Sequence, residues 1–183
     1  MRQIRHKLLS TKVESFFNQL DITALFVGKD LTSWNGTRLP THELINEKGI
    51  QFFKSKTIDI NSFSTVFINP ANHESFIHAD NRDHNICRVN YILQGEGKML
   101  WYNLGKNNEK IVTTKFTTGI VDYYIKYEEI ESKEIVDVWD GKAGDCALTK
   151  INAPHNIITG NLNRVVLSIR INEPFEKLYD ILE

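Results

Sequence analysis

The residues with the clearest chemical potential stand in two short stretches, His78-Ala79-Asp80 and Pro154-His155. A His and an Asp two positions apart on a strand point to the same face, because strand side chains alternate with a period of two. One further imidazole, such as that of His155, would complete a set of two nitrogens and one carboxylate oxygen. Such a set binds a metal from one side and leaves its opposite face open for other ligands. A His-x-Asp pair on its own is also common at the end of a strand, with the carboxylate in solvent.

The segments around these residues favour the metal site. After His78 and Asp80 come two strand-like segments, 87–93 and 98–102, joined by the short turn Gly95-Glu96-Gly97. Further along, a strand led by Pro154-His155 is followed by the turn Thr159-Gly160-Asn161 and a strand led by Arg164. The order is therefore His-x-Asp, several strands, Pro-His, a tight turn and an Arg-led strand.

This order, over roughly residues 60–172, resembles the Fe(II)/2-oxoglutarate-dependent dioxygenases, which are built on a double-stranded β-helix. It looks most like their aspartyl/asparaginyl β-hydroxylase-like branch, which includes small bacterial and phage members. The resemblance implies that iron is bound by His78, Asp80 and His155. It also implies that Arg164 holds the distal carboxylate of the cosubstrate 2-oxoglutarate.

A second cosubstrate contact is implied by the same branch, in which an Arg-x-His follows the metal pair on the next strand. The matching stretch here is Arg88-Val89-Asn90, so that Asn90 stands in place of the family's His. Arg88 and Asn90 are therefore candidate cosubstrate-binding residues, and the change to Asn alters the second contact.

The function implied is that of a hydroxylase that uses Fe(II), 2-oxoglutarate and O2 and releases succinate and CO2. Its substrate is unidentified; a small molecule or a protein side chain is expected, with amino-acid or protein side chains favoured. One alternative is a cupin-type metalloenzyme, either an isomerase or a 2-oxoglutarate-independent dioxygenase, because Gly144-Asp145 followed by Pro154-His155 matches half of a cupin pattern. The first cupin motif, however, has His-x-His and a Glu. A non-catalytic ligand-binding β-barrel is the other alternative.

The role of Arg164 also has a physical basis, because an Arg binds carboxylates through two parallel hydrogen bonds. If Thr159–Leu162 form a four-residue hairpin loop, His155 faces Val166 and Arg164 lies on the side of His155, about 7 Å away. A five-residue loop would turn Arg164 outward. Arg170 shares the face of Arg164 by even spacing and is the fallback, although an exposed strand Arg is the simpler interpretation of it.

Two other histidines, His84 and His73, lie close in sequence to the metal strand. His84 follows His78 by six residues, and a zinc site made by His78, Asp80, His84 and His155 is conceivable. The polar run around His84 is more typical of a loop over the pocket. His73 precedes the metal strand and lies either at the pocket mouth or on a surface loop. Substrate specificity is expected from the loops 30–40, 69–74 and 81–86.

The pattern of the remaining sequence predicts a mainly β protein, a jelly-roll or cupin-like double-stranded β-helix with flanking N- and C-terminal helices. We expect one domain over residues 1–183, divided into an N-terminal helical and loop region (1–57), the β-helix core (58–172) and a C-terminal helix (173–183). Within the first region, apolar spacing predicts a helix over 12–20, turn-rich residues predict a loop over 30–40, and a short helix over 41–47 is expected to end at Gly49.

Composition is ordinary for a globular protein, with 41% hydrophobic and 25% charged residues. The net charge of -1 shows no basic surface for nucleic acid, so no nucleic-acid partner is expected. No stretch of the sequence predicts a membrane span or a signal peptide. The two cysteines, Cys87 and Cys146, do not suggest a disulfide framework, which favours a cytoplasmic location. The oligomeric state is not predicted.

Overall fold

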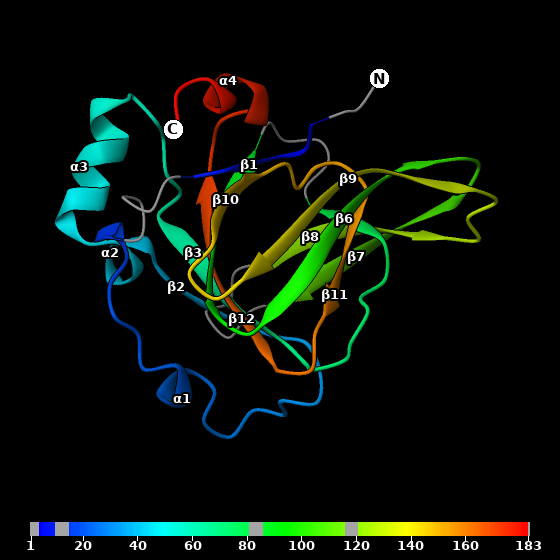
Figure 1. Ribbon diagram of the computed structural model, residues 1–183, viewed down its shortest axis with the longest axis horizontal. Coiled ribbons are helices and arrows are strands. Elements are labelled where there is room, and N and C mark those ends of the chain that lie inside the picture. Colours follow the sequence, from blue (N-terminus) through cyan, green and yellow to red (C-terminus); the bar gives the residue numbers. More distant parts are fainter. Residues whose placement is uncertain (1–3, 10–14, 81–85, 116–120, 183) are drawn as a thin grey trace.

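The computed structural model describes residues 4–9, 15–80, 86–115 and 121–182. Within them, two six-stranded antiparallel sheets pack against each other (Figure 1). The first sheet has the order β1 (His6–Leu8), β10 (Cys146–Thr149), β5 (Cys87–Gln94), β12 (Arg164–Ile171), β3 (Phe63–Asn69) and β2 (Asn35–Pro40). The second has the order β7 (Asn108–Lys115), β8 (Val121–Glu128), β4 (His78–Asp80), β11 (His155–Thr159), β6 (Glu96–Leu104) and β9 (Lys133–Lys142).

The strand order identifies the fold. Strands β3, β5, β10 and β12 lie in the first sheet, whereas β4, β6, β9 and β11 lie in the second. Each early strand has a late strand as its neighbour, as in β5-β12-β3 and β4-β11-β6. This is the arrangement of a double-stranded β-helix, so the predicted jelly-roll fold is confirmed. Strands β1 and β2 extend the first sheet, and the β7–β8 hairpin extends the second.

Alternation along β12 separates the interior of the barrel from its outer face. Arg164, Val166 and Ser168 line the space between the sheets. The intervening residues belong to a hydrophobic cluster on the other face of the first sheet: Val165, Leu167, Ile169 and Ile171. That cluster is covered by α2 (Thr41–Leu44), α3 (Glu47–Ser55) and α4 (Phe175–Tyr179), which lie at the left and top of Figure 1. Burial on both faces therefore holds β12 and the neighbouring strands of the first sheet in place.

The N-terminal region differs from the expectation of helices and loops alone. Besides the short helix α1 (Ile22–Leu25), it contributes strands β1 and β2 to the first sheet. The predicted loop over 30–40 is wrong for its second half, because Asn35–Pro40 pairs with Phe63–Asn69 along its whole length. Pairing with β3 supplies hydrogen-bond partners that outweigh the turn tendency of Asn35-Gly36. Pro40 is accommodated because it ends a strand at the sheet edge.

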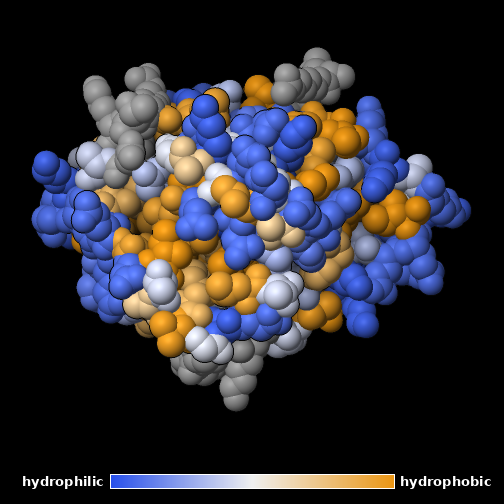
Figure 2. All heavy atoms as spheres, turned by 60° about the horizontal axis from the view of Figure 1, so that its bottom comes forward, coloured by the Kyte–Doolittle hydropathy of each residue, from blue (hydrophilic) through white to orange (hydrophobic). Residues whose placement is uncertain are grey.

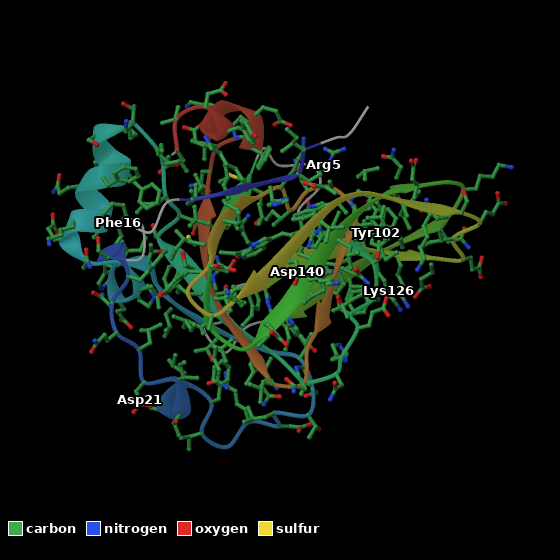
Figure 3. All side chains as sticks on the ribbon, viewed as in Figure 1. Arg5, Phe16, Asp21, Tyr102, Lys126 and Asp140 are labelled. Atoms are coloured by element: carbon green, nitrogen blue, oxygen red, sulfur yellow. The ribbon has the colours of Figure 1, made fainter. Side chains whose placement is uncertain are left out.

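The helix predicted over 12–20 is also wrong in its described part, which begins at residue 15. Phe17 forms a β-bridge with Ile45, and the Phe16 ring lies 4.9 Å from that of Phe52 on α3 (Figure 3). The apolar residues thus pack against α3 without forming a regular helix. The chain passes α3 closely at Gly49, where an added Cβ would lie 2.8 Å from the Phe16 Cβ.

Gly49 itself lies inside α3, so it does not end a helix as predicted. Two helices occupy this segment, and the side chain of Asn46 caps the second by accepting a hydrogen bond from the Gly49 amide. At the other end of the chain a C-terminal helix forms as expected, although only over Phe175–Tyr179, and Phe175 and Leu178 are buried.

The surface of the barrel end carries exposed apolar side chains. Figure 2 brings the bottom of Figure 1 forward and shows hydrophobic side chains gathered across the middle of this face, bordered by hydrophilic ones. None of the helices in the described part of the chain has the length and apolar character needed to span a membrane.

Candidate metal centre

Three side chains with metal-binding atoms meet where β4 and β11 lie side by side. His78 and His155 are opposite each other in the antiparallel register, and their ring centroids are 4.4 Å apart. Asp80 projects from the same face of β4 as His78, because Ala79 between them points the other way and is fully buried. The donor atoms of all three residues lie within 4.8 Å of one another. The structure therefore assembles the three residues that the sequence singled out.

Backbone carbonyls orient both imidazoles for metal binding. The Nδ1 atom of His155 lies 2.8 Å from the carbonyl oxygen of Ala153, and Nδ1 of His78 lies 3.1 Å from that of Phe76. When each Nδ1–H donates to its carbonyl, each Nε2 is left with a free lone pair. Nε2 of His78 faces Oδ1 of Asp80 at 3.6 Å. Two such nitrogens and one carboxylate oxygen fit a divalent transition metal, and the carbonyl contacts are the supporting bonds that metal-binding histidines normally have.

The carboxylate of Asp80 has two different neighbours. Oδ1 faces His78, whereas Oδ2 lies 3.6 Å from Nε of Arg88 on β5. Burial alone would raise the pKa of Asp80, but its electrostatic interactions with His78 and with the guanidinium of Arg88 outweigh burial and hold the pKa below its ordinary value. Asp80 is therefore an ionised carboxylate at neutral pH and a candidate metal ligand, and Oδ2, the oxygen that does not face His78, lies beside Arg88.

Arg164 opens β12 and lines the same pocket as the three donors. The residue is 3% exposed, its guanidinium stacks 5.6 Å from the ring of Trp139, and its Nε has no hydrogen-bond partner among the described residues. Burial lowers the pKa of Arg164 to about 10, so the side chain stays charged at neutral pH. A buried cation that has no carboxylate partner among the described residues calls for an anion from outside the protein.

Space for Arg164 is provided by a glycine on the opposite sheet. A Cβ at Gly97 of β6 would lie 3.1 Å from Cδ of Arg164 and 2.6 Å from the carbonyl oxygen of Ile158. The absence of a side chain there lets the Arg164 side chain cross the barrel interior.

The predicted hairpin between His155 and Arg164 is wrong. Strand β11 pairs with β4 and β6, whereas β12 pairs with β3 and β5, so the turn after Thr159 carries the chain from one sheet to the other. Both side chains nevertheless face the pocket, because each points into the space between the two sheets. Arg164 lies opposite Asn69 in the register. Arg170, the fallback, does not line the pocket and lies opposite Arg88.

Asn90 lines the pocket, but its side-chain amide already has hydrogen-bond partners within the protein. Its Nδ2 donates to Oγ1 of Thr149 at 2.8 Å, and its Oδ1 accepts from Oγ of Ser168 at 2.6 Å. Ser168 in turn accepts a hydrogen bond from Arg88 at 3.4 Å. Asn90 therefore supports the residues that contact Arg88, and Arg88 in turn contacts the candidate metal ligand Asp80. Direct contact of Asn90 or Arg88 with a cosubstrate stays a prediction.

The expected loops contribute as far as they are described. His73 lines the pocket, as does Trp34 from the segment before β2. His84 and residues 81–85 lie outside the described residues, and so does the alternative zinc arrangement. Asn69, at the start of the expected loop 69–74, also lines the pocket. Sequence reasoning did not assign roles to two further lining residues, Phe76 and Tyr124. Phe76 could have been found from its even spacing to His78, whereas Tyr124 reaches the site only because β8 pairs with β4.

No family model matches this sequence, and no curated protein matches it. Among solved structures, the coconut allergen cocosin is similar over 85% of this chain and 31% of its own, at 12% identity and a TM-score of 0.46. The 11S allergen of Cocos nucifera matches over 78% of this chain and 29% of its own, at 13% identity and a TM-score of 0.42. Vicilin of hazelnut, Corylus avellana, matches over 80% of this chain and 33% of its own, at 10% identity and a TM-score of 0.42. The chain thus spans about a third of the length of these proteins.

The buried imidazole should make the metal-free protein sensitive to acid. Burial, followed by the charge of His78, lowers the pKa of His155 to about 3, whereas in the unfolded chain it is about 6.5. The contribution of His155 to the free energy of unfolding is fully present above pH ~6.5. It falls as the pH drops toward 3, because only the unfolded chain takes up the proton. We expect a loss of up to about 1.4 kcal/mol per pH unit, measured from urea midpoints between pH 7 and 5. His155→Gln should flatten this slope, and an unchanged slope would contradict the assignment.

Proposed function

We propose that this protein is an Fe(II)- and 2-oxoglutarate-dependent oxygenase that hydroxylates an amino-acid or protein side chain. The observation that carries the proposal is the presence of two complementary features in one pocket. His78, Asp80 and His155 offer three donors for a metal, and the buried Arg164 offers a positive charge that has no carboxylate partner among the described residues. A cosubstrate with two carboxylates needs both features, one at each end.

Each residue has a distinct task in this proposal. His78, Asp80 and His155 would hold the iron, and Arg164 would bind the distal carboxylate of 2-oxoglutarate through its planar guanidinium. When bound, iron and 2-oxoglutarate supply the oxidising chemistry, for which protein side chains have no equivalent. Arg88 keeps Asp80 in place through Oδ2, the carboxylate oxygen that does not face His78. The hydrogen-bonded pair Asn90–Ser168 in turn keeps Arg88 in place.

The remaining wall of the pocket supports the same assignment. Apolar side chains from both sheets and from the segment after β10 line the same pocket as the candidate metal ligands and Arg164, namely Met99, Ile157, Val166 and Ile151. These side chains limit the access of water to the site, which strengthens the attraction between Arg164 and a carboxylate. They also contain no group that would compete as a nucleophile or general base.

The test is addition of 2-oxoglutarate to the anaerobic protein loaded with Fe(II). We expect a visible metal-to-ligand charge-transfer band, since the carboxylate and keto oxygens would chelate the metal held by the three ligands. Succinate, which has both carboxylates but no keto group, is the matched control and should give no band. A protein that binds one equivalent of iron and gives no band with 2-oxoglutarate would contradict the proposal and favour the cupin-type alternative.

A further inference from the structure

Two exposed aromatic side chains stand at the same pocket. Trp34 is 45% exposed and Phe76 is 44% exposed, and both line the pocket that holds the metal ligands. The other large hydrophobic side chains that are exposed in the described residues are aliphatic: Ile4, Leu8, Val27, Leu31, Ile111, Ile135 and Leu162. Exposed Trp and Phe are thus concentrated at one place, and an exposed apolar patch at a pocket typically marks a binding surface.

Each exposed ring is supported by a second aromatic ring. Trp34 packs on Phe67 of β3, with ring centroids 5.5 Å apart. Phe76 stacks on Tyr124 of β8 at 5.4 Å, with ring planes 22° apart. Phe67 belongs to the first sheet and Tyr124 to the second, and both also line the pocket. The pocket therefore has a pair of aromatic rings on each of its two walls.

The pair on the second sheet reaches the metal ligands. The Phe76 ring lies 5.4 Å from that of His78, and the Tyr124 ring lies 5.8 Å from it. Tyr124 is opposite Asp80 in the register of β4 and β8. A ligand ring that packs on Phe76 is consequently held beside the metal site, where the atoms attached to that ring can reach it.

Positive charges lie against both pairs. The Nζ atom of Lys126 is 5.3 Å from the Phe76 ring centroid, and the guanidinium of Arg88 is 5.5 Å from that of Phe67. Figure 3 shows Lys126 on the side of the second sheet, away from α2 and α3. A cation already attracted to the electron-rich face of a ring repels a second cation and favours an electron-rich neutral ring.

We propose that the mouth of this pocket binds an uncharged aromatic ring of the substrate, between the Trp34–Phe67 and Phe76–Tyr124 pairs. The assignment of this ring to a substrate rests on the proposed oxygenase function, whereas the existence of the ring-binding site does not. Combined with that function, the site selects an amino acid or peptide with an uncharged aromatic side chain over an aliphatic or cationic one.

The test uses two neutral probes with the same backbone, N-acetyl-L-tyrosine amide and N-acetyl-L-leucine amide. Tyramine, which joins the same phenol ring to an ammonium group, is the cationic probe. Ligand-observed NMR titration of the protein, without added metal or 2-oxoglutarate, measures their affinities. We expect the tyrosine amide to bind about threefold or more tightly than either of the others.

Variants test whether the ring binds where we propose. Phe76→Leu and Trp34→Leu keep apolar bulk and remove the π face, and each should weaken the tyrosine amide about twofold to tenfold, the usual range for one aromatic contact. Leu31→Ala and Ile135→Ala remove exposed apolar side chains that do not line the pocket, and neither should weaken it. Circular dichroism verifies that each variant is folded.

Three outcomes would overturn the inference. The leucine amide could bind as tightly as the tyrosine amide, tyramine could bind most tightly, or the two Leu variants could bind the tyrosine amide as well as the unaltered protein does. Because the titration contains no metal and no cosubstrate, its result is independent of the charge-transfer test. Failure of the oxygenase proposal and failure of the ring site can thus be told apart.

Discussion

Replacement of His78, Asp80 or His155 by Ala should abolish stoichiometric Fe(II) binding. The three donors lie within 4.8 Å of one another, so each supplies one third of the protein ligands, and loss of one leaves a pair that cannot hold the metal against water. Anaerobic titration with Fe(II) measures the binding, and circular dichroism verifies the fold.

The chain contains a matched control for this experiment. His6 and Asp137 form a second His–Asp pair, 2.8 Å apart, and neither residue lines the pocket. His6→Ala removes a histidine with a carboxylate neighbour and should leave Fe(II) affinity unchanged. Full-affinity iron binding in all three triad variants, or an equal loss in His6→Ala, would show that the triad is not the metal site.

Arg164→Ala should weaken 2-oxoglutarate at least tenfold and leave Fe(II) affinity nearly unchanged. A lost hydrogen bond between charged groups costs about 1.5–3 kcal/mol, and the buried position of Arg164 favours the upper part of that range. Arg164→Lys should recover only part of the affinity, because an ammonium is a point charge that cannot form two parallel bonds. The measurement is titration of the anaerobic Fe(II) protein with 2-oxoglutarate.

Arg170→Ala is the control on the same strand. Arg170 lies outside the pocket lining, so its removal should change cosubstrate affinity much less. If Arg170→Ala loses binding while Arg164→Ala keeps it, the carboxylate is held by Arg170. If neither variant changes the affinity, 2-oxoglutarate is not the cosubstrate, and a cupin-type metalloenzyme becomes the better explanation.

The pairing of two candidate metal ligands was predictable because it depends on local geometry. Two residues of a strand separated by one position share a face in any sheet, so His78 and Asp80 could be paired from the sequence alone. The order of strands and turns, together with the Pro-His and Arg-led segments, carried the family resemblance that implied the double-stranded β-helix, which the structure confirms. The roles that the resemblance implied for His155 and Arg164 stay predictions. The C-terminal helix followed from its apolar spacing and from Pro174 at its start.

Partners distant in the sequence were not predictable. A hairpin was the natural expectation for β11 and β12, yet the two strands lie in different sheets, and the choice of partner strand depends on the packing of the whole barrel. Asn35–Pro40 has the composition of a turn and becomes a strand only because β3 offers an edge. Likewise, the short apolar segment near Phe16 is held by contacts with α3.

The same distinction applies within the site. Sequence spacing identified which residues could bind a metal and an anion, because that depends on residue type and on the period of a strand. Only the tertiary structure decided that Arg88 lies beside Asp80, that Asn90 is hydrogen-bonded to Thr149 and Ser168, and that two aromatic pairs line the pocket of the candidate metal ligands. Those contacts join strands that are far apart in the chain, and their register is determined by burial of both sheets against a common interior.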